Sequence, residues 1–233
     1  MQTSDWLTRG DAPEADWAPH VLRLATRGGL GRVGDLLLDL PSLAQPWSCQ
    51  SGACTPGLRE TRHRSCCADL DVGIAPEEEE AIDASILSIA AQMTGDPRWT
   101  GPVPRWRDAG VLTRPGRRCI FARLEPTGLQ CGLHRTEDAA GLPRGALKPL
   151  PCRLFPLALI DLGDRRLLTA VHRSTARFLA SGSARRFPCV GVGTRALARA
   201  EWKTLAELFG ARAGERIARA AEDWAMANQS AAE

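Results

Sequence analysis

The residues best suited to chemistry in this chain of 233 residues are its eight cysteines. Three of them, Cys119, Cys131 and Cys152, lie in one stretch that ends in Lys-Pro-Leu-Pro-Cys-Arg-Leu-Phe-Pro, where prolines surround the last thiol. Thiolate sulfur binds zinc and iron–sulfur clusters, and four thiolates close either kind of site. Because no C-x-x-C occurs anywhere in the chain, the site would have to collect single ligands from separate segments.

The adjacent pair Cys66 and Cys67 extends this set. The alternating apolar residues after the pair predict a short strand. Neighbouring side chains on an extended chain point to opposite faces, so the pair would bridge two metals, or would need a local turn to serve one. All eight thiols are candidate ligands, which we order as Cys66, Cys67, Cys119, Cys131, Cys152, Cys189, Cys54 and Cys49.

Instead of binding metal, the cysteines could be buried structural thiols or could form disulfides, which an even number of cysteines would suit. The N-terminus is polar and acidic, and it lacks the apolar stretch of a signal peptide. We therefore expect a cytoplasmic protein with reduced thiols, which favours metal over disulfides. His134, three residues after Cys131, is either a further zinc ligand or a surface residue. Arg153 could donate hydrogen bonds to metal-bound sulfur.

Composition narrows the choice of partners. The chain is 44% hydrophobic and 24% charged, as is usual for a soluble globular protein. A net charge of +3 is too small to indicate a nucleic-acid partner, and all basic residues except Lys148 and Lys203 are arginines, which we interpret as surface charge. The longest apolar run is far shorter than the roughly 20 residues of a membrane span. We expect a metal ion as partner, and neither nucleic acid nor membrane.

The elements that would position the cysteines indicate an α+β fold, with an irregular cysteine-rich centre, two short β-hairpins and flanking helices. One hairpin turns at Pro126–Gly128, so that Cys119 and Cys131 flank it, and the other turns at Gly163-Asp164. Pro76 and the acidic run 77–80 predict a helix start, with the carboxylates solvated.

The remaining segments are expected to cover this centre. Four glycines in residues 21–40 predict only short helices there. Residues 96–117 are expected to form a loop anchored by Trp99 and Trp106. Two amphipathic helices close the chain, one from a Thr194 cap to Phe209, and the other with a fraying tail from residue 225. We predict one domain overall, with an N-terminal arm and short helices (1–40), a cysteine-cluster metal-binding core (41–192) and C-terminal helices (193–233).

Between Cys49 and Cys189 the chain resembles a bacterial family of zinc- or iron-chelating cysteine-cluster proteins. The likeness rests on the Cys66-Cys67 pair before an acidic helix start, on Cys119 and Cys131, and on the proline-framed Cys152. Cys152 stands in Lys-Pro-x-x-Cys-Arg-x-Phe-Pro, which fits the family's later motif (R/K)-P-x-x-C-(R/H)-x-(F/Y)-P. The family's C-x-x-C-x-x-C-C opening is not reproduced, because the upstream cysteines form C-x4-C.

The resemblance implies a metal centre, either zinc or an iron–sulfur cluster, whose biochemical role is unknown. It extends in particular to a branch of uncharacterised proteins of about this length, in which Cys189 matches a further cysteine. Some relatives are linked to lysine N-methylation of flagellin. The alternative function is therefore a metal- or cluster-dependent enzyme, such as a protein lysine N-methyltransferase or an oxidoreductase. No residue of this sequence can be assigned a catalytic or cofactor-binding role.

Overall fold

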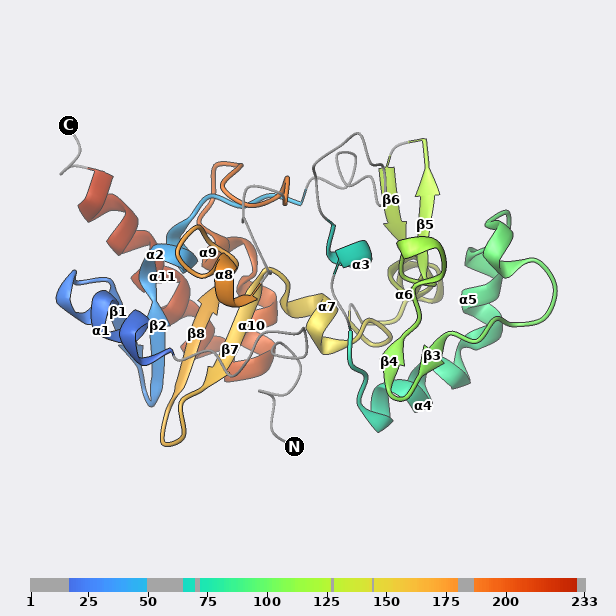
Figure 1. The fold of residues 1–233 in the computed structure, drawn as a ribbon, viewed down its shortest axis with the longest axis horizontal. Coiled ribbons are helices and arrows are strands. Elements are labelled where there is room, and N and C mark those ends of the chain that lie inside the picture. Colours follow the sequence, from blue (N-terminus) through green and yellow to red (C-terminus); the bar gives the residue numbers. More distant parts are fainter. Residues whose placement is uncertain are drawn as a thin grey trace. The chain divides into compact units, whose positions relative to one another are not determined.

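The chain separates into two compact units (Figure 1), where the sequence predicts one domain. The first unit comprises Met1–Cys49, Leu154–Arg185 and Cys189–Glu233, and the second comprises Gln50–Arg153 and Arg186–Pro188. The computed structural model describes residues 17–49, 65–69, 72–126, 128–143, 145–179 and 187–229. Both units contain helices and small sheets, so the α+β class is confirmed.

A four-stranded sheet organises the first unit. Its strands, in spatial order, are β1 (Leu30–Val33), β2 (Leu36–Asp39), β8 (Arg166–Ala170) and β7 (Leu157–Asp161). The outer pairs are antiparallel hairpins, whereas β2 and β8 are parallel, with Leu37 opposite Leu167. All four residues of β2 are buried, as expected of a strand that is covered on both faces.

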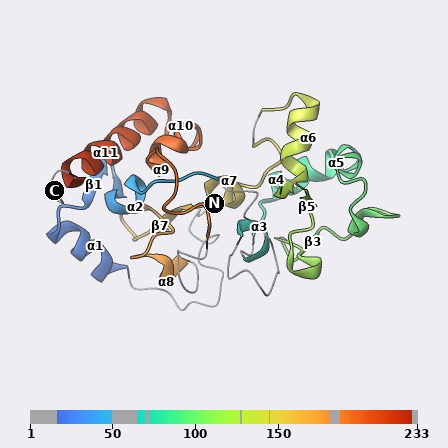
Figure 2. The same ribbon diagram turned by 90° about the horizontal axis from the view of Figure 1, so that it is seen from above.

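Helices lie on both sides of this sheet (Figure 2). On one side are α1 (Ala18–Thr26) and α8 (Ala176–Leu179), and on the other are α10 (Trp202–Phe209) and α11 (Ala211–Gln229). Two short helices, α2 (Leu40–Ala44) and α9 (Leu197–Ala200), contact α11. On the α1 side, Trp17 packs with Phe178, their rings 4.7 Å apart, over Leu37 and Leu167. This aromatic contact fixes the start of α1 on the sheet.

The sequence predicts that any helices over residues 21–40 are short, but it does not predict the β1–β2 hairpin that the segment also forms. Gly34 adopts a φ of 59° in the turn, a conformation that suits glycine. The glycines there serve turns and strands, and do not merely interrupt helices.

The predicted C-terminal helices are present, with different boundaries. The first is divided into α9 and α10, and Ala196, not Thr194, is its N-cap residue. Gly210 follows α10 with a φ of 84° and separates it from α11, as its sequence position suggests. The part of the predicted fraying tail that the structure describes is helical, because α11 continues to Gln229, and residues 230–233 lie outside the described residues.

The second unit is a set of short elements around an aromatic core. In chain order these are α3 (Cys66–Asp69), α4 (Pro76–Ala84), α5 (Ile86–Gln92), β3 (Arg107–Asp108), β4 (Val111–Leu112), β5 (Ala122–Glu125), β6 (Gly128–Cys131), α6 (Gly132–Ala140) and α7 (Leu150–Leu154). Phe121 is fully buried, with the rings of Trp99 and Trp106 at 5.7 and 5.6 Å. The two tryptophans are therefore anchors, as predicted, but residues 96–117 are not only a loop, because β3 and β4 pair within them.

Both predicted hairpins are confirmed, β5–β6 in the second unit and β7–β8 in the first. The helix predicted from Pro76 forms, but it is interrupted at Ser85, which separates α4 from α5. Ile82, Ile89 and Met93 still line one apolar stripe and are fully buried.

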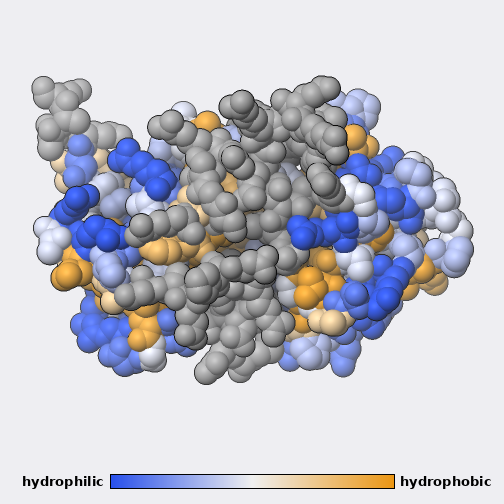
Figure 3. Space-filling view, in the orientation of Figure 1, coloured by the Kyte–Doolittle hydropathy of each residue, from blue (hydrophilic) through white to orange (hydrophobic). Residues whose placement is uncertain are grey.

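The visible surface mixes hydrophilic and apolar residues on each unit (Figure 3). The large exposed apolar side chains come from separate segments, for example Leu22 of α1, Leu87 of α5 and Met226 of α11. Within the described residues, no helix combines the length and apolar character that crossing a membrane requires.

Candidate metal centre

Five of the predicted ligands belong to the second unit, and they come from four segments. Cys66 and Cys67 begin α3, Cys119 lies just before β5, Cys131 ends β6, and Cys152 lies within α7. All five are free cysteines and partly buried. Three of these side chains, those of Cys119, Cys131 and Cys152, pack against the core that holds Phe121.

The Cys66-Cys67 pair lies in a helical turn and not on an extended chain. The turn brings the two sulfur atoms to 3.9 Å from each other. The opposite-face geometry of a strand therefore does not apply, and both thiols are available to one site. A local turn that lets both thiols serve one metal is one of the two arrangements expected for the pair from the sequence.

The pKa values of the two neighbouring thiols are shifted in opposite directions. The hydrogen bond from the Cys67 thiol, opposed by burial and aided by the positive charge of Lys148, lowers the pKa of Cys66 to about 7. The same hydrogen bond, together with burial, raises the pKa of Cys67 well above its usual range. Cys66 is therefore the thiol of this pair that ionises first.

The other three thiols favour the protonated form in the absence of a metal. Burial, reinforced by the charge of Cys131, raises the pKa of Cys119 to about 12. Burial also raises the pKa of Cys131 and of Cys152, and Lys148 opposes the shift in both. Each of these thiols lies close enough to Cys66 for their charges to interact. The five sulfur atoms thus share one electrostatic environment.

Lys148 supplies the positive charge of this environment. Although burial opposes its charged form, the thiolates of Cys131, Cys152, Cys66 and Cys67 raise its pKa. It is one of only two lysines in the chain. An ammonium group among thiolates offsets part of the negative charge that a metal-thiolate site accumulates.

Backbone amides also point at the sulfur atoms. The N–H of Phe121 bonds to the sulfur of Cys119, and the N–H groups of Leu133 and His134 bond to that of Cys131. Cys131 is the N-cap residue of α6, where free amides are expected. Such hydrogen bonds stabilise a thiolate and lower its pKa.

Carboxylates hold the segment that carries Lys148 and Cys152. Glu137 Oε1 accepts from the amides of Leu147 and Lys148 at 2.7 and 2.9 Å. Glu78 Oε1 accepts from the amide of Leu150 at 2.7 Å. Since residues 149 and 151 are prolines, every backbone N–H from 147 to 151 is bound by a carboxylate. The proline frame predicted from the sequence is thus held in place by acidic side chains.

These two glutamates are not recognisable as site residues in the sequence. The prediction that the run 77–80 is solvated is wrong for Glu78, whose other carboxylate oxygen accepts from the amide of Ala75 at 3.0 Å. Glu79 is also engaged, in an ion pair with Arg107 at 3.2 Å. The contact of Glu78 with the amide of Ala75, three residues earlier, could be predicted from the spacing of a capping box. No sequence signal predicts its contact with the amide of Leu150.

The other three predicted ligands are not among the described residues of the second unit. Cys189 is buried in the first unit, Cys49 is exposed there, and Cys54 lies outside the described residues. His134 faces Asp138, with its Nε2 3.9 Å from the carboxylate. In the part of the chain that the structure describes, no three His, Cys, Asp or Glu side chains stand ready, as placed, to hold a metal ion.

No family model, curated protein or solved structure matches the chain. The likeness to cysteine-cluster proteins therefore stays a prediction from the motifs, as does the alternative of a metal- or cluster-dependent enzyme. The thiol environment of the second unit is the feature that bears on function.

The acidity of Cys66 leads to a testable expectation. In reduced, metal-free protein, iodoacetamide should modify Cys66 before the other four thiols, at a rate that rises with pH through about 7, because the thiolate is the nucleophile. Peptide mapping by mass spectrometry between about pH 5 and pH 9 measures this profile. Cys67→Ala removes the hydrogen bond and should move the midpoint towards the ordinary value of about 8.5. An unchanged midpoint would contradict the assignment.

Proposed function

We propose that the protein binds zinc or an iron–sulfur cluster through the thiolates of Cys66, Cys67, Cys119, Cys131 and Cys152. The observation that carries the proposal is the gathering of five free thiols from four segments. Four of them interact with the charge of Lys148, and Cys119 interacts with Cys131 and Cys66. Soft sulfur ligands match both kinds of centre, and four thiolates suffice for either. A fifth thiol provides a bridging or spare ligand.

The donor set fits such a centre in its chemistry. A Zn²⁺ ion with four thiolates carries two net negative charges, and one ammonium group offsets half of this charge. The amides that point at Cys119 and Cys131 stabilise the thiolate form further. Binding requires the side chains to move closer together than they are in this structure, since no three of those described are yet placed to hold an ion. The proposal is confined to the five thiols of one unit, and participation of the other three stays a prediction.

Metal content tests the proposal directly. Protein purified without air should contain close to one equivalent of zinc, or iron with inorganic sulfide, by elemental analysis. Broad absorption at about 400 nm would identify an iron–sulfur cluster, and a colourless protein with bound zinc would identify a zinc site. Substoichiometric zinc and iron together, also after reconstitution of the reduced protein, would refute the proposed function.

A further inference from the structure

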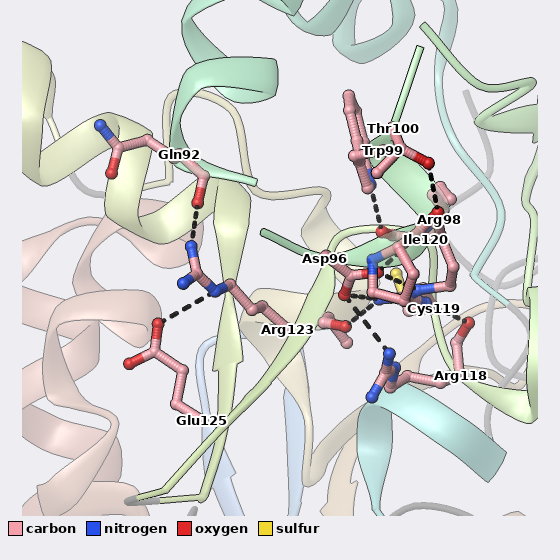
Figure 4. A network of polar contacts seen from close by, with 12 residues as sticks. Gln92, Asp96, Arg98, Trp99, Thr100, Arg118, Cys119, Ile120, Arg123 and Glu125 are labelled. Carbon is pink, nitrogen blue, oxygen red and sulfur yellow. Dashed lines mark hydrogen bonds and ion pairs between the residues drawn. The ribbon is translucent and has the colours of Figure 1, made fainter. Parts of the chain in front are cut away.

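Arg98 and Asp96 form a buried ion pair beside Cys119 (Figure 4). Arg98 Nε and Nη2 donate to the two carboxylate oxygens at 2.9 and 2.7 Å. The Asp96 side chain is only 2% exposed and that of Arg98 14%. Arg118 Nη2 donates to the same carboxylate at 3.3 Å. The two-pronged contact fixes the plane of the Arg98 guanidinium group.

The remaining donors of Arg98 hold the backbone around Cys119. Nη1 donates to the carbonyl oxygen of Cys119 at 2.9 Å, and Nη2 donates to that of Ala122. The next side chain, Trp99, donates from Nε1 to the carbonyl of Ile120 at 2.9 Å. Side chains thus satisfy carbonyl groups along the chain just before and at the start of β5, where an irregular segment needs such partners.

The amide side of Cys119 is fixed as well. Its N–H donates to the carbonyl oxygen of Cys67 at 2.7 Å, which joins the Cys119 segment to the turn that carries the thiol pair. With both of its peptide groups held, the Cys119 backbone has little freedom to redirect its sulfur. Arg98 therefore holds the peptide group directly bonded to the Cα atom that carries the side chain of this candidate ligand.

We propose that Arg98, oriented by Asp96, is a positioning residue that directs the Cys119 sulfur towards the other thiols. The inference rests on the proposed metal-binding function and assigns it a residue outside the cysteines. Because the guanidinium group serves a carboxylate and several carbonyls in one plane, lysine cannot replace it. The arginine that composition alone would assign to the surface is thus built into the site.

Arg98→Lys in the full-length protein tests this role, with Ile82→Val as the matched control. Ile82 is fully buried in the same unit, and its truncation lowers stability without removing a hydrogen bond to the Cys119 segment. Competition with a chromophoric chelator should show zinc affinity about 10- to 100-fold weaker in Arg98→Lys, as is typical for residues that orient ligands, and unchanged in Ile82→Val. Equal affinities in the two folded variants would overturn the proposal.

A second readout does not need a metal. In the metal-free protein, Arg98→Lys should increase the alkylation rate of Cys119 relative to Cys131, whereas Ile82→Val should not change this ratio. Asp96→Asn, which keeps the size of the side chain and loosens the guanidinium group, should act in the same direction if Arg98→Lys fails to fold. An unchanged ratio in these variants would overturn the positioning role. A wild-type protein that binds no metal would instead refute the proposed function, and the alkylation ratio would still decide the role of Arg98.

Discussion

Replacing Asp96 with alanine is expected to lower the free energy of unfolding of the second unit by about 3–5 kcal/mol. This is the usual cost of removing one partner of a buried ion pair. The substitution leaves the guanidinium group of Arg98 buried without its counter-ion and removes a partner of Arg118. It also frees the amide of Arg98, which donates to Asp96 at 3.0 Å. Urea unfolding of the metal-free protein at neutral pH measures the loss, and a change below about 1 kcal/mol would contradict the assignment.

The same pair predicts how this effect depends on pH. Burial opposes the charged carboxylate of Asp96, but the hydrogen bonds from Arg98 and the charges of Arg98 and Arg118 outweigh it and lower the pKa of Asp96. Its contribution is therefore complete above the unfolded pKa of about 3.9 and is lost as the pH falls through the lower folded value. The difference in free energy of unfolding between wild type and Asp96→Ala should therefore become smaller as the pH falls below about 3.9.

Local signals in the sequence are sufficient for the hairpins. A turn rich in proline and glycine predicts β5–β6, and Gly163-Asp164 predicts β7–β8, because such turns depend on the residues at the turn itself. The pairing of β2 with β8 could not be predicted in this way. Leu37 and Leu167 lie far apart in the chain, and their pairing is selected by burial of the sheet between two layers of helices.

For the candidate site, residue types identify the candidate ligands but not the residues that hold them in place. A thiol such as Cys152 is recognisable by its type alone, so all five grouped cysteines can be predicted from the sequence. Their supports, Glu78, Glu137 and Arg98, act on backbone groups remote in sequence, for which no spacing rule exists. Arg98 is also indistinguishable by composition from the many arginines of this chain. Positioning side chains of this kind become visible only when the backbone path is known.

Metal loading is expected to stabilise the second unit substantially. A ligand that binds only the folded state at a free concentration about 1,000 times its dissociation constant contributes about 4 kcal/mol. Zinc added to the reduced protein should therefore slow hydrogen exchange of the β5–β6 hairpin, which carries Cys131 and follows Cys119. Exchange measured by mass spectrometry is the suitable method, because it resolves this segment from the first unit.

Cys152→Ser should remove most of that stabilisation while leaving the metal-free protein nearly as stable as wild type. Serine keeps the size of the side chain but loses the thiolate, and the segment of Cys152, a proposed ligand, is held in place by Glu78 and Glu137. Cys49→Ser is the matched control, because this exposed cysteine belongs to the first unit. If Cys152→Ser responds to zinc as wild type does, Cys152 is not a ligand. If instead Cys152→Ser destabilises the metal-free protein as much as Asp96→Ala does, the thiol of Cys152 serves packing and not metal binding.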